Sequence, residues 1–562
     1  MNGLSKINSI IFKTLFILFF LMYPVTFLMV FCFLIPGFFL CKGKIEYVIL
    51  YSCLFYYSNI LLINLTKLNI KFLITIIFVE IISFLIFNFK NTKIIKIPKN
   101  LYNCISFVIL ISIIMGFFLP YFNFSDAMYH YSFLRKILTE QKFINFSPFY
   151  GSEFYDIRYS YSFVIPLYSF FVKLLNNIFS LNSSIRYVWN SSSIFVYILS
   201  VLSWFICIKS YYGKKTAKIS IFVFTILFFG ISSDLWNGLA FSLSIYPLSF
   251  ALFIMLPIIL YVLKQNNRYL LIILGFVLSG IHIFYALLFL FHIIIYSLIK
   301  KRYFYIFCYI LGILPITMLK FYNFNIQNEF FNNITSISYN YLFKHSMNGV
   351  SGYINVILFF VFMIFYKIFK KRKFIFYLYI ASIILILITP LFSKIITLNS
   401  QKLLRIYQII PPVLYFSPVF LIFYKRMKKT IIFVFIVFLL ITTFNLTIKS
   451  NKSTLKQALA IEKILINADL KGKILCDPSF SMLITSFTSA YAISVLPEYS
   501  APSVKNIYER QKAYDMFLQK GEIIFECDYV LILPEHKIFA EKYKNKINIG
   551  KDFYLIDLKK GE

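Results

Sequence analysis

The sequence predicts a polytopic α-helical membrane protein of about 12 to 14 spans with a small extracytoplasmic C-terminal α/β domain. Three observations support this fold class. The chain of 562 residues is 60% hydrophobic, and its mean hydropathy of +0.79 is far above that of an ordinary soluble enzyme. Apolar stretches long enough to cross a bilayer recur through residues 1–450. Short basic runs separate these stretches, and residues 451–562 have a different, mixed composition.

Charge is divided unevenly between the two parts. The formal net charge is +34; residues 1–450 hold 40 basic and 8 acidic residues, whereas residues 451–562 hold 16 and 14. The basic runs lie between apolar segments: "CKGK" (41–44), "KNTKIIKIPK" (90–99), "GKK" (213–215), "KKR" (300–302), "KKRK" (370–373) and "KRMKK" (425–429). This distribution is typical of cytoplasmic loops under the positive-inside rule, and not of the single basic face that binds nucleic acid.

The apolar segments predict the spans. They lie at 9–40, 46–66, 69–88, 102–120, 187–208, 217–232, 240–263, 269–299, 303–321, 353–369, 374–390, 403–423 and 430–448. The first is either one span or a short hairpin through Pro24. The segment 269–299 is predicted to form two short helices with "LSGIHIF" (278–284) as their outer turn.

Placing all basic runs inside fixes the expected topology. Residues 121–160 then lie outside, and 161–180, interrupted by Pro166 and polar residues, is predicted to be a helix on the outer surface. We therefore expect a membrane domain over 1–450 with its first large outer loop at 121–186. The expected location is the inner (cytoplasmic) membrane, crossed many times, with 451–562 as an extracytoplasmic domain.

The C-terminal part reads as alternating helices and strands. "STLKQALAIEKILI" (453–466) predicts a helix capped by Ser453. The predicted strands are "KILCD" (473–477), "YAISVLP" (491–497), "YVLILP" (529–534) and "FYLIDLK" (553–559). Cys476 and Cys527 would pair only in an oxidising compartment.

Acidic residues gather in the first outer loop. Of the eight in residues 1–450, four fall there: Asp126, Glu140, Glu153 and Asp156. Carboxylates at a membrane are costly and usually functional, so this loop is the expected site. Asp126 and His130 share a helix face at i, i+4 spacing, although Asp126 would equally suit a capped first turn.

The stretch "YGSEFYDIRYSYSF" (150–163) sets Glu153, Asp156 and Arg158 among aromatic rings. Such a composition suits sugar recognition, in which rings stack on the sugar and acids bind its hydroxyls. An interfacial aromatic belt is the alternative.

Further polar residues are expected on the same outer side: His282, His345, Lys402 and Arg405. Cations there would hold a lipid-linked phosphate or reach toward lipid headgroups. The sequence contains no GxxxxGK[ST], GxGxxG or HExxH motif, so a nucleotide cradle and a zincin site are not predicted. No DxD pair indicates an obligatory metal; Asp126 with Glu153 or Asp156 would supply ligands for an optional Mg²⁺ or Mn²⁺.

Four stretches carry a resemblance to a known family. They are "SDAMYHYSFLRKIL" (125–138), "GIHIFYALLFLF" (280–291), "SQKLLRIYQIIPP" (400–412) and "LCDPSFSMLITSFTSAYAISVLPEYSAP" (475–502). Together with the layout of spans, outer loop and outer tail, they resemble the GT-C superfamily of integral membrane glycosyltransferases. Many members have two adjacent acids where Ser125 and Ala127 flank Asp126 here.

The resemblance implies transfer of a sugar from a polyprenyl-phosphate donor to a glycan, lipid or protein acceptor on the outer face, with inversion. Asp126 would be the general base, and Arg405, with Lys402, would neutralise the departing phosphate. Two alternatives stay open. An outer-face glycan polymerase or ligase would depend on Arg405 and His345 instead of a carboxylate, and a lipid or glycan transporter would carry ionisable residues deep within its spans.

Overall fold

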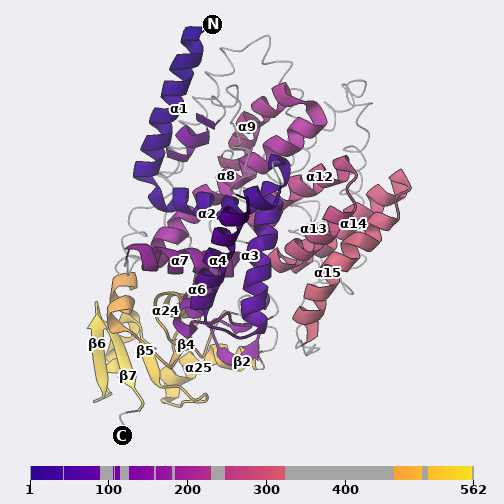
Figure 1. Ribbon diagram of the computed structural model, residues 1–562. Coiled ribbons are helices and arrows are strands. Elements are labelled where there is room, and N and C mark those ends of the chain that lie inside the picture. Colours follow the sequence, from indigo (N-terminus) through magenta and orange to yellow (C-terminus); the bar gives the residue numbers. More distant parts are fainter. Residues whose placement is uncertain are drawn as a thin grey trace, which may run out of the picture.

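The computed structural model describes residues 2–41, 44–88, 105–106, 108–113, 126–156, 160–179, 184–229, 247–322, 461–496, 504 and 506–559 (Figure 1). Within these ranges the chain is mostly helical, with a small sheet region near the C-terminus. Four helices are long and apolar enough to cross a membrane, or five if the bent pair α1–α2 is one span. The spans expected within 353–448 and the expected boundary near 450 lie outside the described residues.

The N-terminal segment forms two helices, α1 (Asn2–Met22) and α2 (Pro24–Leu40), bent by 108° between them. Pro24 explains where the second begins, because proline lacks an N–H and its fixed φ suits the first helical position. The segment 9–40 is therefore divided into two helices at Pro24, the residue at which the sequence allows a hairpin.

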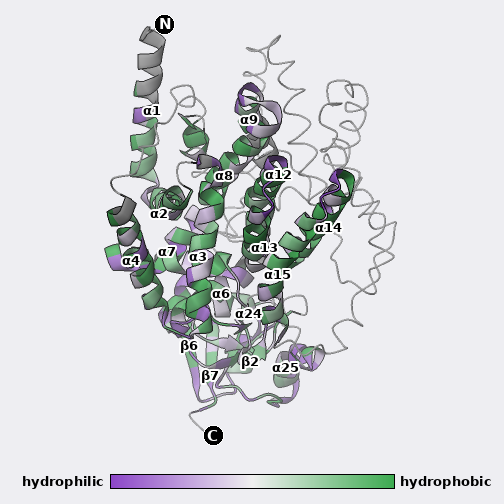
Figure 2. Ribbon diagram, turned by 45° about the vertical axis from the view of Figure 1, so that its right-hand side comes forward, coloured by the Kyte–Doolittle hydropathy of each residue, from purple (hydrophilic) through white to green (hydrophobic). Residues whose placement is uncertain are grey.

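The helical body continues through elements that match most of the predicted segments. They are η1 (Ile45–Tyr47), α3 (Val48–Leu65), α4 (Ile70–Asn88), α6 (Asp126–Glu140), α7 (Val164–Phe179), α8 (Ser184–Tyr212), α9 (Lys214–Phe229), α11 (Pro247–Ser249), the π-helical η3 (Phe250–Met255), α12 (Leu256–Gln265), α13 (Tyr269–Ile281), α14 (Ile283–Lys300) and α15 (Phe304–Tyr322). Hydrophobic residues dominate these helices (Figure 2). Large apolar side chains stay exposed on α4 and α15, including Phe78, Ile82, Phe307 and Leu314, a surface of the kind that faces lipid.

Helices α13 and α15 run in the same direction in close contact. A Cβ on Gly312 would lie 2.1 Å from the Ile272 carbonyl oxygen, and one on Gly275 would lie 2.6 Å from the Tyr309 carbonyl oxygen. Only glycine allows the two backbones to approach this closely.

The chain reverses between α13 and α14. His282, in extended conformation (φ −159°, ψ 102°), ends the first helix and begins the second. At the far end of α14, Tyr296 donates to the Leu263 carbonyl and Arg302 donates to Asn266, just before α13 starts. The predicted break within 278–284 is confirmed.

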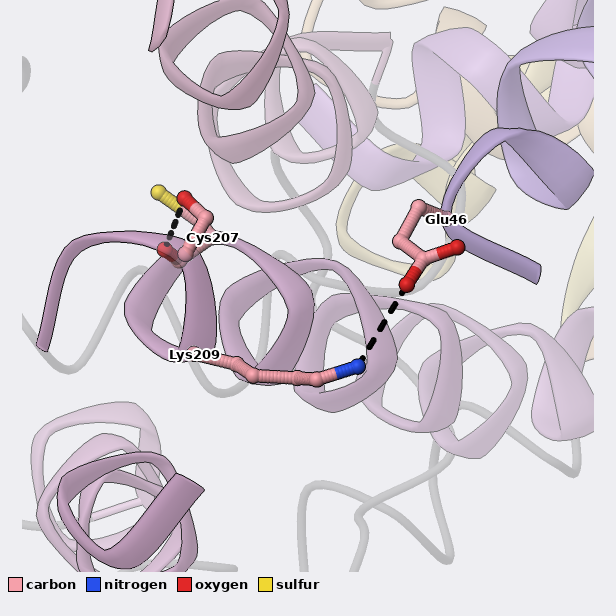
Figure 3. A network of polar contacts seen from close by, with 4 residues as sticks. Glu46, Cys207 and Lys209 are labelled. Carbon is pink, nitrogen blue, oxygen red and sulfur yellow. Dashed lines mark hydrogen bonds and ion pairs between the residues drawn. The ribbon is translucent and has the colours of Figure 1, made fainter. Parts of the chain in front are cut away.

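One end of the helical body gathers the basic turns. Lys209 of α8 pairs with Glu46 of η1 at 3.3 Å (Figure 3), and Tyr211 donates to the Leu260 carbonyl. We call this the basic end; it also holds the turns 265–269 and 300–304. The turns at the other end include 141–145, where Asn64 of α3 contacts the Asn145 amide.

The helix predicted over 161–180 is present as α7, and its expected place on the outer surface of the membrane stays a prediction. It packs against α6, α8 and α4, and nearly all of residues 164–175 are buried. The polar residues at its C-terminal end did not indicate this burial, which neighbouring helices provide.

The C-terminal sheet lies beyond the end of the body opposite the basic end (Figure 1). Its strands are β3 (Lys473–Leu475), β4 (Tyr491–Ala492), β5 (Tyr529–Ile532), β6 (Lys546–Gly550) and β7 (Phe553–Asp557), in the order β4-β3-β5-β7-β6. β4, β3 and β5 are parallel, whereas β7 pairs antiparallel with β5 and β6. Its helices are α24 (Ser481–Phe487), α25 (Ile507–Lys520), η6 (Pro534–His536) and α26 (Lys537–Ala540).

The four predicted strands all appear, and β6 is an additional one. The predicted helix 453–466 is described only from 461, where it is helical; Ser453 lies outside the described residues. Cys476 and Cys527 are both free cysteines.

Candidate functional site

Helix α6 begins at Asp126, the residue proposed from the sequence as the general base. Helical spacing places positions 126, 129 and 130 on one face. The His130 ring is half-buried and lies 5.7 Å from the Tyr129 ring, edge to face. The face that starts at Asp126 therefore continues through Tyr129 and His130.

Asp156 reaches the same helix from another segment. It follows β2 (Gly151–Tyr155), which pairs with β1 (Phe146–Ser147), and it is 0% exposed. Its Oδ2 accepts a hydrogen bond of 2.9 Å from the Tyr129 hydroxyl. A buried carboxylate needs such donors, so this bond fixes Asp156 one helical turn from the position of Asp126.

Glu153 lies in a different environment. It is exposed on β2 and pairs with Lys473 of the C-terminal sheet at 2.8 Å. The structure therefore places Glu153 in a contact between the hairpin and the sheet, not beside the buried Asp156. Among the described parts of the chain, no group of three or more His, Cys, Asp or Glu is arranged to hold a metal ion.

The region of the C-terminal sheet contacts α6 directly through Lys136. This side chain is 0% exposed, and its Nζ donates to the carbonyls of Ser489 (2.7 Å) and Ala490 (2.5 Å). The ammonium also lies 4.0 Å from the centre of the Tyr491 ring. Burial lowers the pKa of Lys136 to about 7, with the Glu140 carboxylate acting in the opposite direction.

A second contact lies one turn earlier on α6. The Ser132 hydroxyl is 3.0 Å from that of Thr485 and 2.9 Å from that of Ser486. All three are buried, and Ser132 and Ser486 also donate to the Met128 carbonyl, so these hydroxyls form one hydrogen-bonded cluster. We name the contacts of Ser132 and Lys136 with residues 485–491 the α6–tail interface.

Helix α15 ends beside Tyr155, the last residue of β2. The hydroxyl of the half-buried Tyr155 donates to the Lys320 carbonyl (2.6 Å) and contacts the Ser160 hydroxyl (2.8 Å). Partial burial raises the pKa of Tyr155 to about 12. Lys320 is 1% exposed, and its Nζ has no hydrogen bond or ion pair with any residue in the described ranges. Sequence analysis missed Lys320, although a lysine ending an apolar segment was a visible signal that resembles ordinary snorkelling.

His282 also reaches this end of the body. It follows Gly280, whose carbonyl accepts from the Phe163 amide, and its ring is 4.8 Å from that of Tyr285. The structure thus brings the α13–α14 turn to the segment that follows Asp156. Arg158, His345, Lys402 and Arg405 lie outside the described residues, so their expected convergence stays a prediction.

Comparison with known proteins gives no family assignment. No protein-family model matches the chain, and no curated protein matches it.

Proposed function

We propose that this chain is an integral membrane glycosyltransferase, crossing the inner membrane about 12 to 14 times. It moves a sugar from a polyprenyl-phosphate donor to an acceptor on the extracytoplasmic face, with inversion. One observation carries the proposal most directly. The helix that begins at Asp126 and the buried Asp156 meet through Tyr129, at the end of the body opposite the basic end.

The charge distribution supports the choice of side. Under the positive-inside rule, the basic end faces the cytoplasm, so α6, the β1–β2 hairpin and the C-terminal sheet face outward. A polyprenyl-linked donor presents its sugar at that level of the membrane. It also needs no nucleotide-binding motif, which agrees with the sequence.

In the proposed reaction, the acceptor hydroxyl oxygen forms a bond to the anomeric carbon while the bond from that carbon to the phosphate oxygen breaks. Asp126 takes the hydroxyl proton, and the electron pair of the broken bond stays on the phosphate. Lys320 is a described cation at this end and would neutralise the departing phosphate, alongside Lys402 and Arg405. Asp156 is a positioning residue, because it holds Tyr129 on the face of α6 that starts at Asp126.

The first test is an Asp126→Asn variant. Cells that carry it in place of the wild-type protein are expected to accumulate the lipid-linked sugar and to lose one residue from a surface glycan, both measured by mass spectrometry. A general base typically contributes about 10²–10⁴-fold in rate, so product should fall to near background.

Glu140→Gln is the matched control, since it removes a carboxylate from the last turn of the same helix. It should leave product formation unchanged. Normal glycans in the Asp126→Asn cells, with the variant present in the membrane, would remove Asp126 as the base. Loss of product on changing Arg405 or His345, with Asp126 dispensable, would instead favour the polymerase or ligase.

A further inference from the structure

An open groove lies at the basic end, far from the candidate catalytic residues. It forms between two neighbouring turns, 265–269 after α12 and 301–305 before α15, and its volume is about 910 Å³. That volume is within the range of sites that hold a small molecule or a lipid headgroup. We call it the basic groove.

The basic groove is lined by cations, and none of the described residues that line it is acidic. Arg268, Lys301 and Arg302 line it, together with the polar residues Gln265, Asn266 and Asn267. None of the three cations forms a salt bridge with a carboxylate in the part of the chain that the structure describes. The positive charge of the groove is therefore not neutralised by these parts of the protein.

The three cations differ in their contacts within the protein. Arg302 donates to Asn266 and to the Tyr305 hydroxyl (3.1 Å), so it joins the two turns. Lys301 and Arg268 are both exposed. Arg268 donates one hydrogen bond to the Tyr269 hydroxyl (3.1 Å) and lies over the Phe304 ring, 5.0 Å from its centre, so most of its N–H groups stay unused. Lys301 and Arg268 are therefore the cations available to an incoming anion.

The rim of the groove is aromatic. Tyr269, Tyr303 and Phe304 are all exposed, although each is large and mostly apolar. Aromatic side chains of this kind concentrate at the level of lipid headgroups, and basic pockets between helix ends on the cytoplasmic side bind anionic headgroups. A soluble anion would need the cations but would leave the aromatic rim without a role.

We propose that the basic groove binds the headgroup of an anionic phospholipid, with Arg268 and Lys301 on its phosphate and the aromatic rim against its glycerol and upper acyl chain. This lipid is distinct from the sugar donor, which is expected at the opposite face, and the inference does not depend on the glycosyltransferase proposal. The occupant would hold the two turns, and so the ends of α12 to α15, at the membrane surface.

The test uses the full-length protein in detergent, titrated with phosphatidylglycerol or phosphatidylcholine, with bound lipid measured by native mass spectrometry. The wild type is expected to bind phosphatidylglycerol at least about tenfold more tightly. Arg268→Gln combined with Lys301→Gln should remove most of this preference. Arg302 is left in place because it joins the turns.

Lys214→Gln combined with Lys215→Gln is the matched control. These lysines are exposed at the same end of the body but do not line the groove, and the charge removed is equal. The control should keep the preference. Equal binding of both lipids, an unchanged preference in the groove variant, or an equal loss in the control would overturn the proposal. Displacement of phosphatidylglycerol by millimolar inorganic phosphate would assign the groove to a soluble anion instead.

Discussion

Two buried lysines lie at the same end of this molecule in opposite circumstances. Lys136, at the α6–tail interface, donates to two main-chain carbonyls and lies on an aromatic ring. Lys320, at the end of α15, is equally buried, but its ammonium has no partner in the described ranges. Burying a charge is costly unless partners replace water. The burial of each lysine therefore needs its own explanation. The first lysine holds two parts of the fold together, and the second suits a ligand that brings its own negative charge.

The largest expected effect is on stability at the α6–tail interface. Lys136→Met should leave the carbonyls of Ser489 and Ala490 without their donor, at a cost of about 2–4 kcal/mol. The measurement is hydrogen exchange of the amides in α6 and around β4, where local opening should become more frequent.

Lys320→Met provides the contrast. Removing an ammonium that has no partner among the described residues should leave stability unchanged or raise it by about 1–2 kcal/mol, while product formation falls. If Lys320→Met instead opened the structure as much as Lys136→Met, Lys320 would be a structural residue and the comparison would fail.

A change in pH is expected to have an intermediate effect on the stability of the α6–tail interface. The unfolded chain keeps the Lys136 proton up to its usual pKa of 10.5, whereas the folded chain releases it near pH 7. The unfolded state therefore binds more protons between these values, and stability of the interface should rise with pH by at most about 1.4 kcal/mol per unit. Urea midpoints for protease cleavage of the tail, measured at pH 7 and pH 9, would test this.

The Lys136→Met variant is the reference for that experiment, because it lacks the titrating group. If the urea midpoint of the wild type were lower at pH 9 than at pH 7, and that of the variant were not, the ammonium–carbonyl bonds would outweigh the cost of burying the charge.

The smallest effect is expected at the exposed contact between the hairpin and the sheet. Glu153→Gln should cost less than about 1 kcal/mol, since solvent screens its pair with Lys473. A double-mutant cycle with Lys473→Met would isolate the pair. A coupling well above that value would contradict the expected screening, whereas lost activity at unchanged stability would support the substrate-binding role that the sequence predicts for Glu153.

Local patterns explain which features the sequence could predict. The strands β3, β4, β5 and β7 lie within apolar runs bounded by charged or turn residues. The break between α13 and α14 lies at the Gly–Ile–His stretch. β6 was missed because "KINIG" mixes polar with apolar residues and none of its five residues is buried. The burial of α7 depends on α6 and α8, which no pattern within 161–180 records.

The candidate site was predictable only in part. The accumulation of acids marked the loop that contains Asp126 and Asp156. The partner of Asp156 was not predictable, because Tyr129 is one tyrosine among 43. The partners of Lys136 are main-chain carbonyls, which any residue could supply, so no sequence signal identifies them.

The α6–tail interface also constrains the order of events during synthesis. Lys136 leaves the ribosome 354 residues ahead of Ala490, whose carbonyl it will contact. At about 5–20 residues per second, that interval lasts on the order of tens of seconds. Throughout it, the helix that begins at Asp126 is without these partners, and the α6–tail interface can form only after residues 485–491 have been translated.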